Sequence, residues 1–169
     1  LDVLEDTTGG RVIQGTCKIG GVRRDIEPEK LGEMHRALDS FEEKCRDLTD
    51  VFLNDETVKY RLRGLGVVGK DAAYALGAVG PTVRASGVRV DLRETGYAAY
   101  GDLDFRPVVE TTGDCYARCA VRAGELFTSI DLIRQAIDAM PDGPLDVKVK
   151  GMPDGEYFSR VEQPRGEVV

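Results

Sequence analysis

The feature that most constrains this fold is a run of apolar residues spaced alternately three and four positions apart. The run consists of Leu31, Met34, Leu38, Phe41, Cys45, Leu48 and Phe52. This spacing predicts one long amphipathic helix that ends at Asn54-Asp55, with a buried apolar seam and the intervening charged residues facing solvent. Pro28 suits its first turn, because a proline lacks the N–H that is unsatisfied there anyway.

A second long helix is predicted to start near Thr112 or Asp114, since either side chain can cap it. Its apolar face consists of Cys119, Leu126, Ile130, Ile133, Ile137 and Met140. Pro141-Asp-Gly-Pro144 ends it, because proline cannot continue a helix. We expect the two long helices to pack antiparallel at the centre of a single domain covering residues 1–169. The predicted fold class is α+β, predominantly helical.

Shorter elements are predicted around this pair. Leu1–Gly10 forms a short helix closed by its paired glycines, Arg11–Lys18 a strand, and Gly20-Gly21 a tight turn. Val58–Leu76 forms one or two short helices. Gly77–Arg106, which is rich in glycine and proline, is irregular apart from brief strands at Val88–Leu92 and Leu103–Phe105.

The C-terminal end is predicted to hold a small β-hairpin. Val147–Lys150 and Tyr157–Val161 alternate apolar and polar residues, as strands with one covered face do. Pro153-Asp-Gly155 lies between them and would form the turn.

Composition excludes several classes of protein. The net charge of −7 argues against a nucleic-acid-binding protein or one that binds anionic membranes, because both need a basic face. No run approaches the roughly 20 apolar residues of a membrane-spanning helix, and the first residues are not expected to act as a signal peptide. The chain is large enough to fold without disulfides, and Cys45, one of its four cysteines, falls on an apolar helical stripe, which favours a reduced, cytoplasmic setting. A start at Leu1, without methionine, is expected of part of a longer protein or of a processed one.

Gly64-x-Gly66-x-x-Gly69 matches the dinucleotide-binding fingerprint, which needs a buried strand before it and a helix after it. A helix can begin near Lys70. However, the preceding Val58–Arg63 carries three charges, unlike a central parallel strand. We therefore favour a turn, and a nucleotide (NAD)-binding module stays as the alternative.

No metal or catalytic residue is assigned from the pattern. Cys115 and Cys119 lie one turn apart on a predicted helix and would need two further ligands to hold a metal, so small packed side chains are favoured. His35 is the single histidine, without a nucleophile near it in sequence. The arginines at 23–24, 84–93 and 118–122 each have an acid nearby, which favours structural pairing with Asp25, Asp91 and Asp114.

Thr112-Gly-Asp-Cys-Tyr-Ala-Arg-Cys-Ala-Val-Arg122 closely resembles a signature of one redox family. It is the catalytic large subunit shared by membrane-bound group 4 nickel–iron hydrogenases and the 49 kDa subunit of respiratory complex I. Three other stretches agree in order and spacing: Ile19–Asp25, Arg84–Arg93 and Pro164–Glu167. The family's nickel ligands are two Cys-x-x-Cys pairs, which this chain lacks, so the resemblance implies the central fragment of a larger subunit.

The resemblance implies a scaffold role in electron transfer from iron–sulfur clusters to protons or to a quinone. In the parent protein a nickel–iron centre, a small iron–sulfur subunit and a membrane arm are implied, at the cytoplasmic face of the membrane. The fragment itself is expected to hold no cofactor, to be inactive alone and to self-associate. Five residues are candidates to line the family's redox or quinone cavity: Gly20, Gly21, Arg84, Arg165 and Glu167. A non-catalytic assembly or scaffold protein remains a further alternative.

Overall fold

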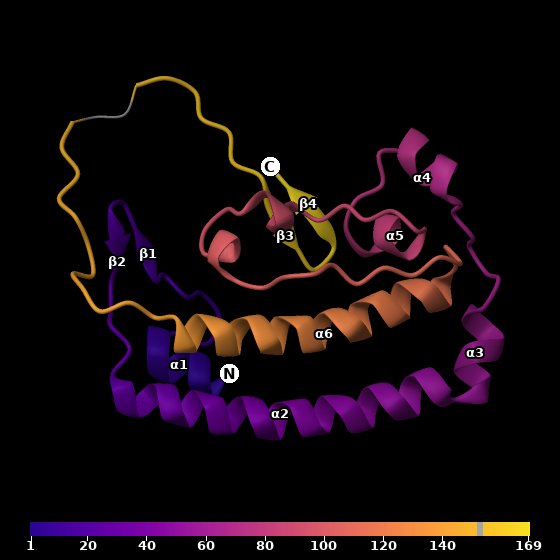
Figure 1. Cartoon of the computed structure of the whole chain (residues 1–169), viewed down its shortest axis with the longest axis horizontal. Helices are drawn as coiled ribbons and strands as arrows, with labels where there is room; N and C mark the ends of the chain where they lie inside the picture. The colour runs from indigo at the N-terminus through magenta and orange to yellow at the C-terminus, as the bar shows by residue number, and fades with distance from the viewer. Residues whose placement is uncertain (152–153) are drawn as a thin grey trace.

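The computed structural model describes residues 1–151 and 154–169. Helices α2 (Pro28–Asn54) and α6 (Cys115–Asp138) form its long axis and run side by side in opposite directions (Figure 1). Contacts at both ends fix this arrangement. His35 Nε2 lies 3.0 Å from Asp138 Oδ1, and the Tyr116 hydroxyl donates to the Leu53 carbonyl at 2.8 Å. The predicted antiparallel pair and the mainly helical fold are confirmed.

The apolar seam of α2 is less covered than its spacing predicts. Cys45 is buried, but Leu48 is 69% exposed and Phe52 43% exposed. The expectation of burial along the whole seam is therefore wrong. The reason is that α6 covers one flank of α2, while the C-terminal half of α2 faces a cavity.

Asp55 joins α2 to the short helix α3 (Glu56–Leu62). It ends α2 with an extended backbone, and its carboxylate accepts from the Val58 amide at 2.8 Å, capping the new helix. Helix α4 (Lys70–Ala75) follows, so the short helices expected between residues 58 and 76 are confirmed.

The middle segment contains a buried helix, α5 (Gly80–Ala85), that the sequence did not predict, and two single turns of 3₁₀ helix, η1 (Leu92–Thr95) and η2 (Tyr100–Asp102). The strands predicted at 88–92 and 103–105 are absent from this described segment. Backbone amides of this segment donate to side chains and not to a neighbouring strand. The Leu92 amide donates to Glu162 Oε2 at 3.2 Å, and the Asp104 amide donates to Gln135 Oε1 at 2.8 Å.

The N-terminal part forms helix α1 (Asp2–Thr8) and a short hairpin, β1 (Cys17–Lys18) with β2 (Gly21–Val22). The predicted helix is confirmed, and the strand expected over 11–18 pairs only at its last two residues. Gly20 makes the turn with φ +90, a conformation that favours glycine.

The C-terminal hairpin is present but lies later in the chain than predicted. It pairs β3 (Val161–Gln163) with β4 (Gly166–Val168). Residues 147–150 do not pair with 157–161; the Val147 amide instead donates to the Gly20 carbonyl at 2.9 Å. The predicted turn at 153–155 includes Pro153, which lies outside the described residues.

Close packing at two glycines holds this hairpin against α5. A Cβ on Gly80, whose φ is +64, would lie 2.4 Å from the Gly166 Cα. The two backbones can approach this closely because neither glycine has a side chain.

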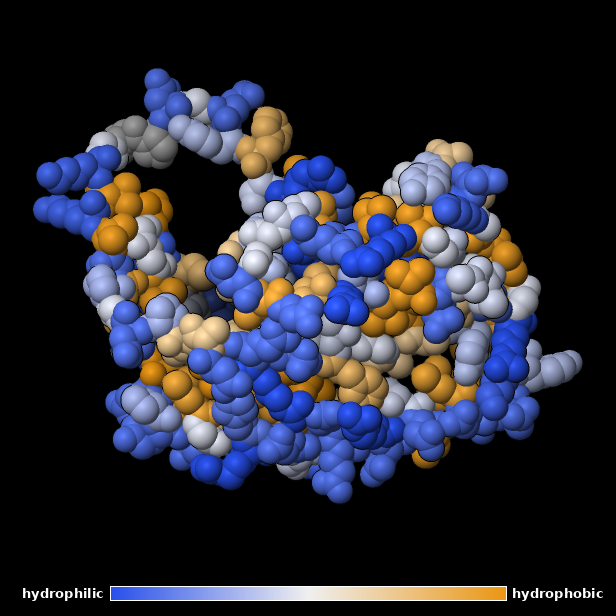
Figure 2. Space-filling model, in the orientation of Figure 1, coloured by the Kyte–Doolittle hydropathy of each residue, from blue (hydrophilic) through white to orange (hydrophobic). Residues whose placement is uncertain are grey.

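The surface differs from one edge to the other (Figure 2). The outer edge along α2 is largely hydrophilic, whereas apolar side chains gather over α4 and α5. Tyr74 and Leu76 there are 60% and 77% exposed. None of the helices in the described ranges is long and apolar enough to cross a membrane.

Candidate functional site

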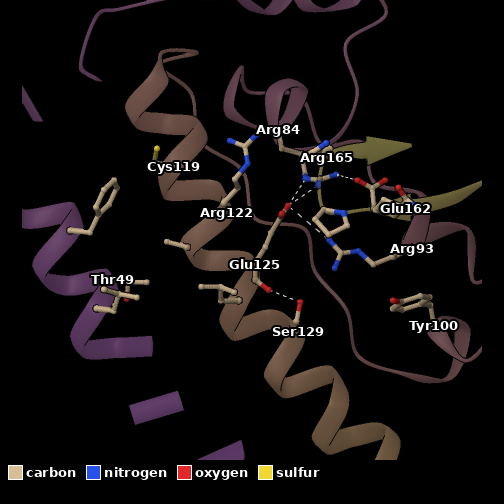
Figure 3. Close-up of a pocket in the computed structure, with 16 residues that line it drawn as sticks. Thr49, Arg84, Arg93, Tyr100, Cys119, Arg122, Glu125, Ser129, Glu162 and Arg165 are labelled. Atoms are coloured by element: carbon tan, nitrogen blue, oxygen red, sulfur yellow. Dashed lines mark hydrogen bonds and ion pairs between the residues drawn. The ribbon is translucent and has the colours of Figure 1, made fainter. Parts of the chain in front are cut away.

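A cavity of about 820 Å³ lies between α2, α6 and the β3–β4 hairpin (Figure 3). Apolar side chains from both long helices form one wall: Leu48, Phe52, Cys119, Ala123 and Leu126. Charged side chains form the opposite end: Arg84, Arg93, Arg122, Glu125, Glu162 and Arg165. A pocket of this volume, mainly apolar with a few converging polar groups, is typical of a small-molecule site.

Arg84 is the centre of the charged end. It lies on α5 and is 1% exposed. Its guanidinium group contacts three carboxylates, and it also donates to the Val90 carbonyl at 3.1 Å. The distances are 2.7 Å from Nη2 to Glu125 Oε1, 3.0 Å from Nη1 to Asp91 Oδ2 and 2.9 Å from Nη1 to Glu162 Oε1. One side chain thereby ties α5 to α6, to β3 and to the loop before η1.

Arg93 forms the second cation of this buried cluster. It binds Asp91 through two bonds, of 2.9 Å from Nε and 2.7 Å from Nη2, and its guanidinium group stacks 4.4 Å from the centre of the Phe105 ring. Burial opposes its charge, but the bonds and charge of Asp91 outweigh burial and raise the pKa of Arg93. We call Arg84, Asp91, Arg93, Glu125 and Glu162 the Arg84 cluster.

Glu125 lies on α6, where the cluster meets the cavity. Its side chain is 13% exposed, and burial raises its pKa above the ordinary value, although Arg84 and Arg93 act in the opposite direction. Nothing in the sequence analysis singled it out. A signal was present, because Glu125 follows the buried Ala117 and Val121 at four-residue steps. An acid on a buried helical stripe indicates a partner.

The five residues predicted to line a redox cavity are not gathered in one place. Arg84 and Arg165 line the cavity described above. Gly20 and Gly21 lie at the β1–β2 turn against residues 145–147, and Glu167 pairs with Arg160 through a 2.7 Å bond from Nη2. Whether any of the five lines the redox cavity of a parent protein stays a prediction.

The structural pairing expected of the arginines is confirmed in one of three places. Arg84 and Arg93 both bind Asp91. Asp25 and the arginines before it form no ion pair in the part of the chain that the structure describes. Arg118 binds the carbonyls of Gly113 and Gly66, at 2.7 and 3.0 Å, instead of binding Asp114.

Asp114 instead caps α6. Its carboxylate accepts from the amides of Ala117 and Gly64, at 2.8 and 2.9 Å, and from the Thr112 hydroxyl at 3.1 Å. Burial alone would raise the pKa of Asp114, but these bonds and the nearby Arg118 outweigh it and lower the pKa. Of the two predicted caps, Asp114 is the one used.

The glycine-rich segment 64–69 does not have the setting of a dinucleotide site. The residues before it form helix α3 instead of a buried strand. The segment packs on the start of α6, where the Cys115 amide donates to the Leu65 carbonyl at 3.0 Å. The amide of Val68 donates to the Gly113 carbonyl at 2.9 Å. The turn favoured from the sequence agrees with these contacts.

Metal-ligating side chains are dispersed. Within residues 1–151 and 154–169, no three His, Cys, Asp or Glu side chains are placed to hold a metal ion. The four cysteines are free thiols, with Cys17 on β1, Cys45 on α2, and Cys115 and Cys119 on α6. They do not fit a nickel–iron centre held by two Cys-x-x-Cys pairs, so we assign no chemical step to such a centre in this chain.

Comparison with known proteins identifies related subunits. The model of the family described as respiratory-chain NADH dehydrogenase, 49 Kd subunit, matches residues 1–152. An NADH-quinone oxidoreductase subunit of Phocaeicola vulgatus is 40% identical over 99% of this chain and 33% of its own length. The membrane-bound hydrogenase subunit alpha of Pyrococcus furiosus is 40% identical over 100% of this chain and 44% of its own length.

A third relative has a different named function. An F(420)H(2) dehydrogenase subunit of Methanosarcina mazei is 39% identical over 99% of this chain and 48% of its own length. The chain thus spans between one third and about half the length of these relatives. The chain is also similar to the hydrogenase subunit and, since the family model covers most of its residues, it belongs to the 49 kDa subunit family of respiratory-chain NADH dehydrogenases.

Proposed function

We propose that the chain forms the central scaffold of a redox large subunit. In the parent complex, electrons from iron–sulfur clusters of a small partner subunit would reach protons or a quinone beside this scaffold. The observation that carries the proposal is the family match over residues 1–152. The cavity supports it, because a mainly apolar pocket with a few converging polar groups suits a small-molecule ligand.

The relatives' names give different redox reactions, so they do not decide between protons and a quinone as the electron acceptor. Subunits named for a quinone reductase, a hydrogenase and an F(420)H(2) dehydrogenase are almost equally similar to this chain. We propose that the parent complex is attached to a membrane arm at the cytoplasmic face of the membrane. The 169 residues alone would be inactive, because ligands for a nickel–iron centre would have to come from elsewhere.

The test is to purify the gene product with its partners from detergent-treated membranes and to measure metals and turnover together. About one nickel per complex with hydrogen evolution would establish a hydrogenase. Quinone reduction with iron but without nickel would establish a quinone reductase. A complex with neither turnover would contradict the proposal and favour the non-catalytic scaffold.

The alternative of an NAD-binding module is tested separately. Because α3 replaces the strand that this fingerprint needs, we expect no saturable change when NADH fluorescence is titrated with the chain. Tight binding that is lost in the Gly66→Val variant would revive the alternative.

A further inference from the structure

The Arg84 cluster contains more negative than positive groups. Two guanidinium groups face three carboxylates, which leaves one negative charge in excess when all are ionised. All five side chains are at most 13% exposed. An unbalanced buried charge is costly in a medium of low dielectric constant, and uptake of one proton removes it.

The hydrogen bonds indicate which carboxylate takes the proton. Both oxygens of Asp91 bind guanidinium groups. Glu162 uses Oε1 for Arg84 and Oε2 for the Leu92 amide. Glu125 uses Oε1 alone, for Arg84 at 2.7 and 2.8 Å, and its Oε2 accepts no hydrogen bond from the described residues.

This free oxygen is open to the cavity. In the described part of the chain no buried side-chain oxygen lacks a hydrogen-bond partner, so Oε2, which has none, is reachable by solvent. Glu125 lines the cavity (Figure 3). A proton can therefore be added at Oε2 without breaking the bonds that Oε1 makes to Arg84.

Groups from several elements surround Glu125 or line the same cavity. Across the cavity α2 contributes only uncharged side chains: Leu48, Thr49 and Phe52. The titratable or charged groups are Arg84 of α5, Asp91 just before η1, Arg93 of η1, Tyr100 of η2, Glu162 of β3, Arg165 of the hairpin turn, and Cys119 and Arg122 of α6 itself. Burial raises the pKa of Glu125, the two cluster arginines lower it and Asp91 raises it again.

We propose that Glu125 is a proton-exchange group, whose Oε2 takes a proton from water in the cavity and delivers it to a reduced ligand bound there. The identity of that ligand rests on the proposed function. In the delivery step the O–H bond at Oε2 breaks, a bond to hydrogen forms on the ligand, and the carboxylate regains its charge. The electrons that reduce the ligand come from the partner's iron–sulfur clusters, and none leaves Glu125.

The first test is an infrared titration of the purified complex, with the chain labelled with ¹³C at glutamate carboxyls. We expect a protonated-carboxyl band that disappears in Glu125→Gln and whose midpoint lies above the ordinary glutamate value of about 4.3. The matched control Glu43→Gln, which makes the same change at an exposed position on α2, should leave this band unchanged. A Glu125-dependent band with an ordinary or lower midpoint would overturn the proposal.

The second test is turnover of the same complexes as a function of pH. Glu125→Gln should lower kcat by about 100-fold or more with KM little changed, because general acids typically contribute that much. Glu125→Asp, which keeps a carboxyl group, should restore part of the rate and shift the pH profile. A Glu125→Gln variant that turns over at the wild-type rate would contradict the proposal. A complex without hydrogen or quinone turnover would overturn the proposed function, while the infrared titration would still decide whether Glu125 exchanges a proton.

Discussion

The Arg84 cluster buries charged side chains, whereas the C-terminal half of α2 exposes apolar ones. Arg84 is the largest side chain that is almost completely buried, whereas Leu48, on an apolar helical seam, is 69% exposed. The charge of Arg84 is neutralised within the chain by carboxylates from three other parts of the fold. The exposed apolar seam has no comparable cover among the described residues. Polar contacts therefore hold the described elements together, while the apolar surface of α2 remains available for other contacts.

The largest effect on stability is expected when Arg84, the central cation of the cluster, is removed. Arg84→Met leaves three carboxylates in a buried site with Arg93 alone, and removing one partner of a buried pair costs about 3–5 kcal/mol. We expect the free energy of unfolding, measured by urea denaturation, to fall by about that much. Arg160→Met removes an exposed partner of Glu167 and should change it little. A loss below about 1 kcal/mol in Arg84→Met would show that the cluster does not hold the fold.

A smaller loss in the free energy of unfolding is expected at Asp114, which caps a helix and is not part of the Arg84 cluster. Asp114→Ala removes the cap of α6 and leaves the amides of Ala117 and Gly64 without their acceptor. Loss of a cap costs about 0.5–2 kcal/mol, and we expect the upper part of this range because two amides lose a partner. Asp114→Asn, which keeps one acceptor oxygen, should lose less in the same urea measurement. Equal losses for both variants would contradict the capping role.

The same cap predicts a dependence on pH. Because the pKa of Asp114 is lower in the folded chain than its ordinary 3.8, the folded state favours the carboxylate. This contribution is fully present above the unfolded pKa and is lost as the pH falls through the folded one. The stability difference between wild type and Asp114→Ala should therefore be constant near neutrality and shrink below about pH 4. A difference that does not change with acidification would contradict this.

Local pattern predicted the parts of the fold that depend on local contacts. The two long helices follow from apolar spacing, and the pairing of Arg84 with Asp91 from their closeness in sequence. The partners Glu125 and Glu162 lie 41 and 78 residues from Arg84, so no local pattern could pair them with it, although the buried stripe on α6 marked Glu125 as an acid that needs a partner. The hairpin was misplaced because its position depends on the close contact between Gly80 and Gly166. Likewise, apolar spacing predicts which face of α2 is apolar. It does not predict how much of that face packs against α6.

The smallest effect on stability, with a clear effect on association, is expected at the exposed seam. Leu48 is largely in contact with water, so Leu48→Glu should change the free energy of unfolding by no more than about 0.5 kcal/mol. If the exposed apolar surface causes the predicted self-association, a charge at this position should suppress it, because burying an unpaired carboxylate is costly. Light scattering over a concentration series would measure the association.

The matched control is Val12→Glu, which adds the same charge at a side chain that is 87% exposed and lies outside the cavity. Association that persists in Val12→Glu but is lost in Leu48→Glu would assign it to the α2 seam. Loss in both variants would indicate general charge repulsion, because the chain already carries a net charge of −7. A wild-type chain that stays monomeric at high concentration would refute the self-association. The Leu48 side chain would then remain exposed to solvent in the monomer.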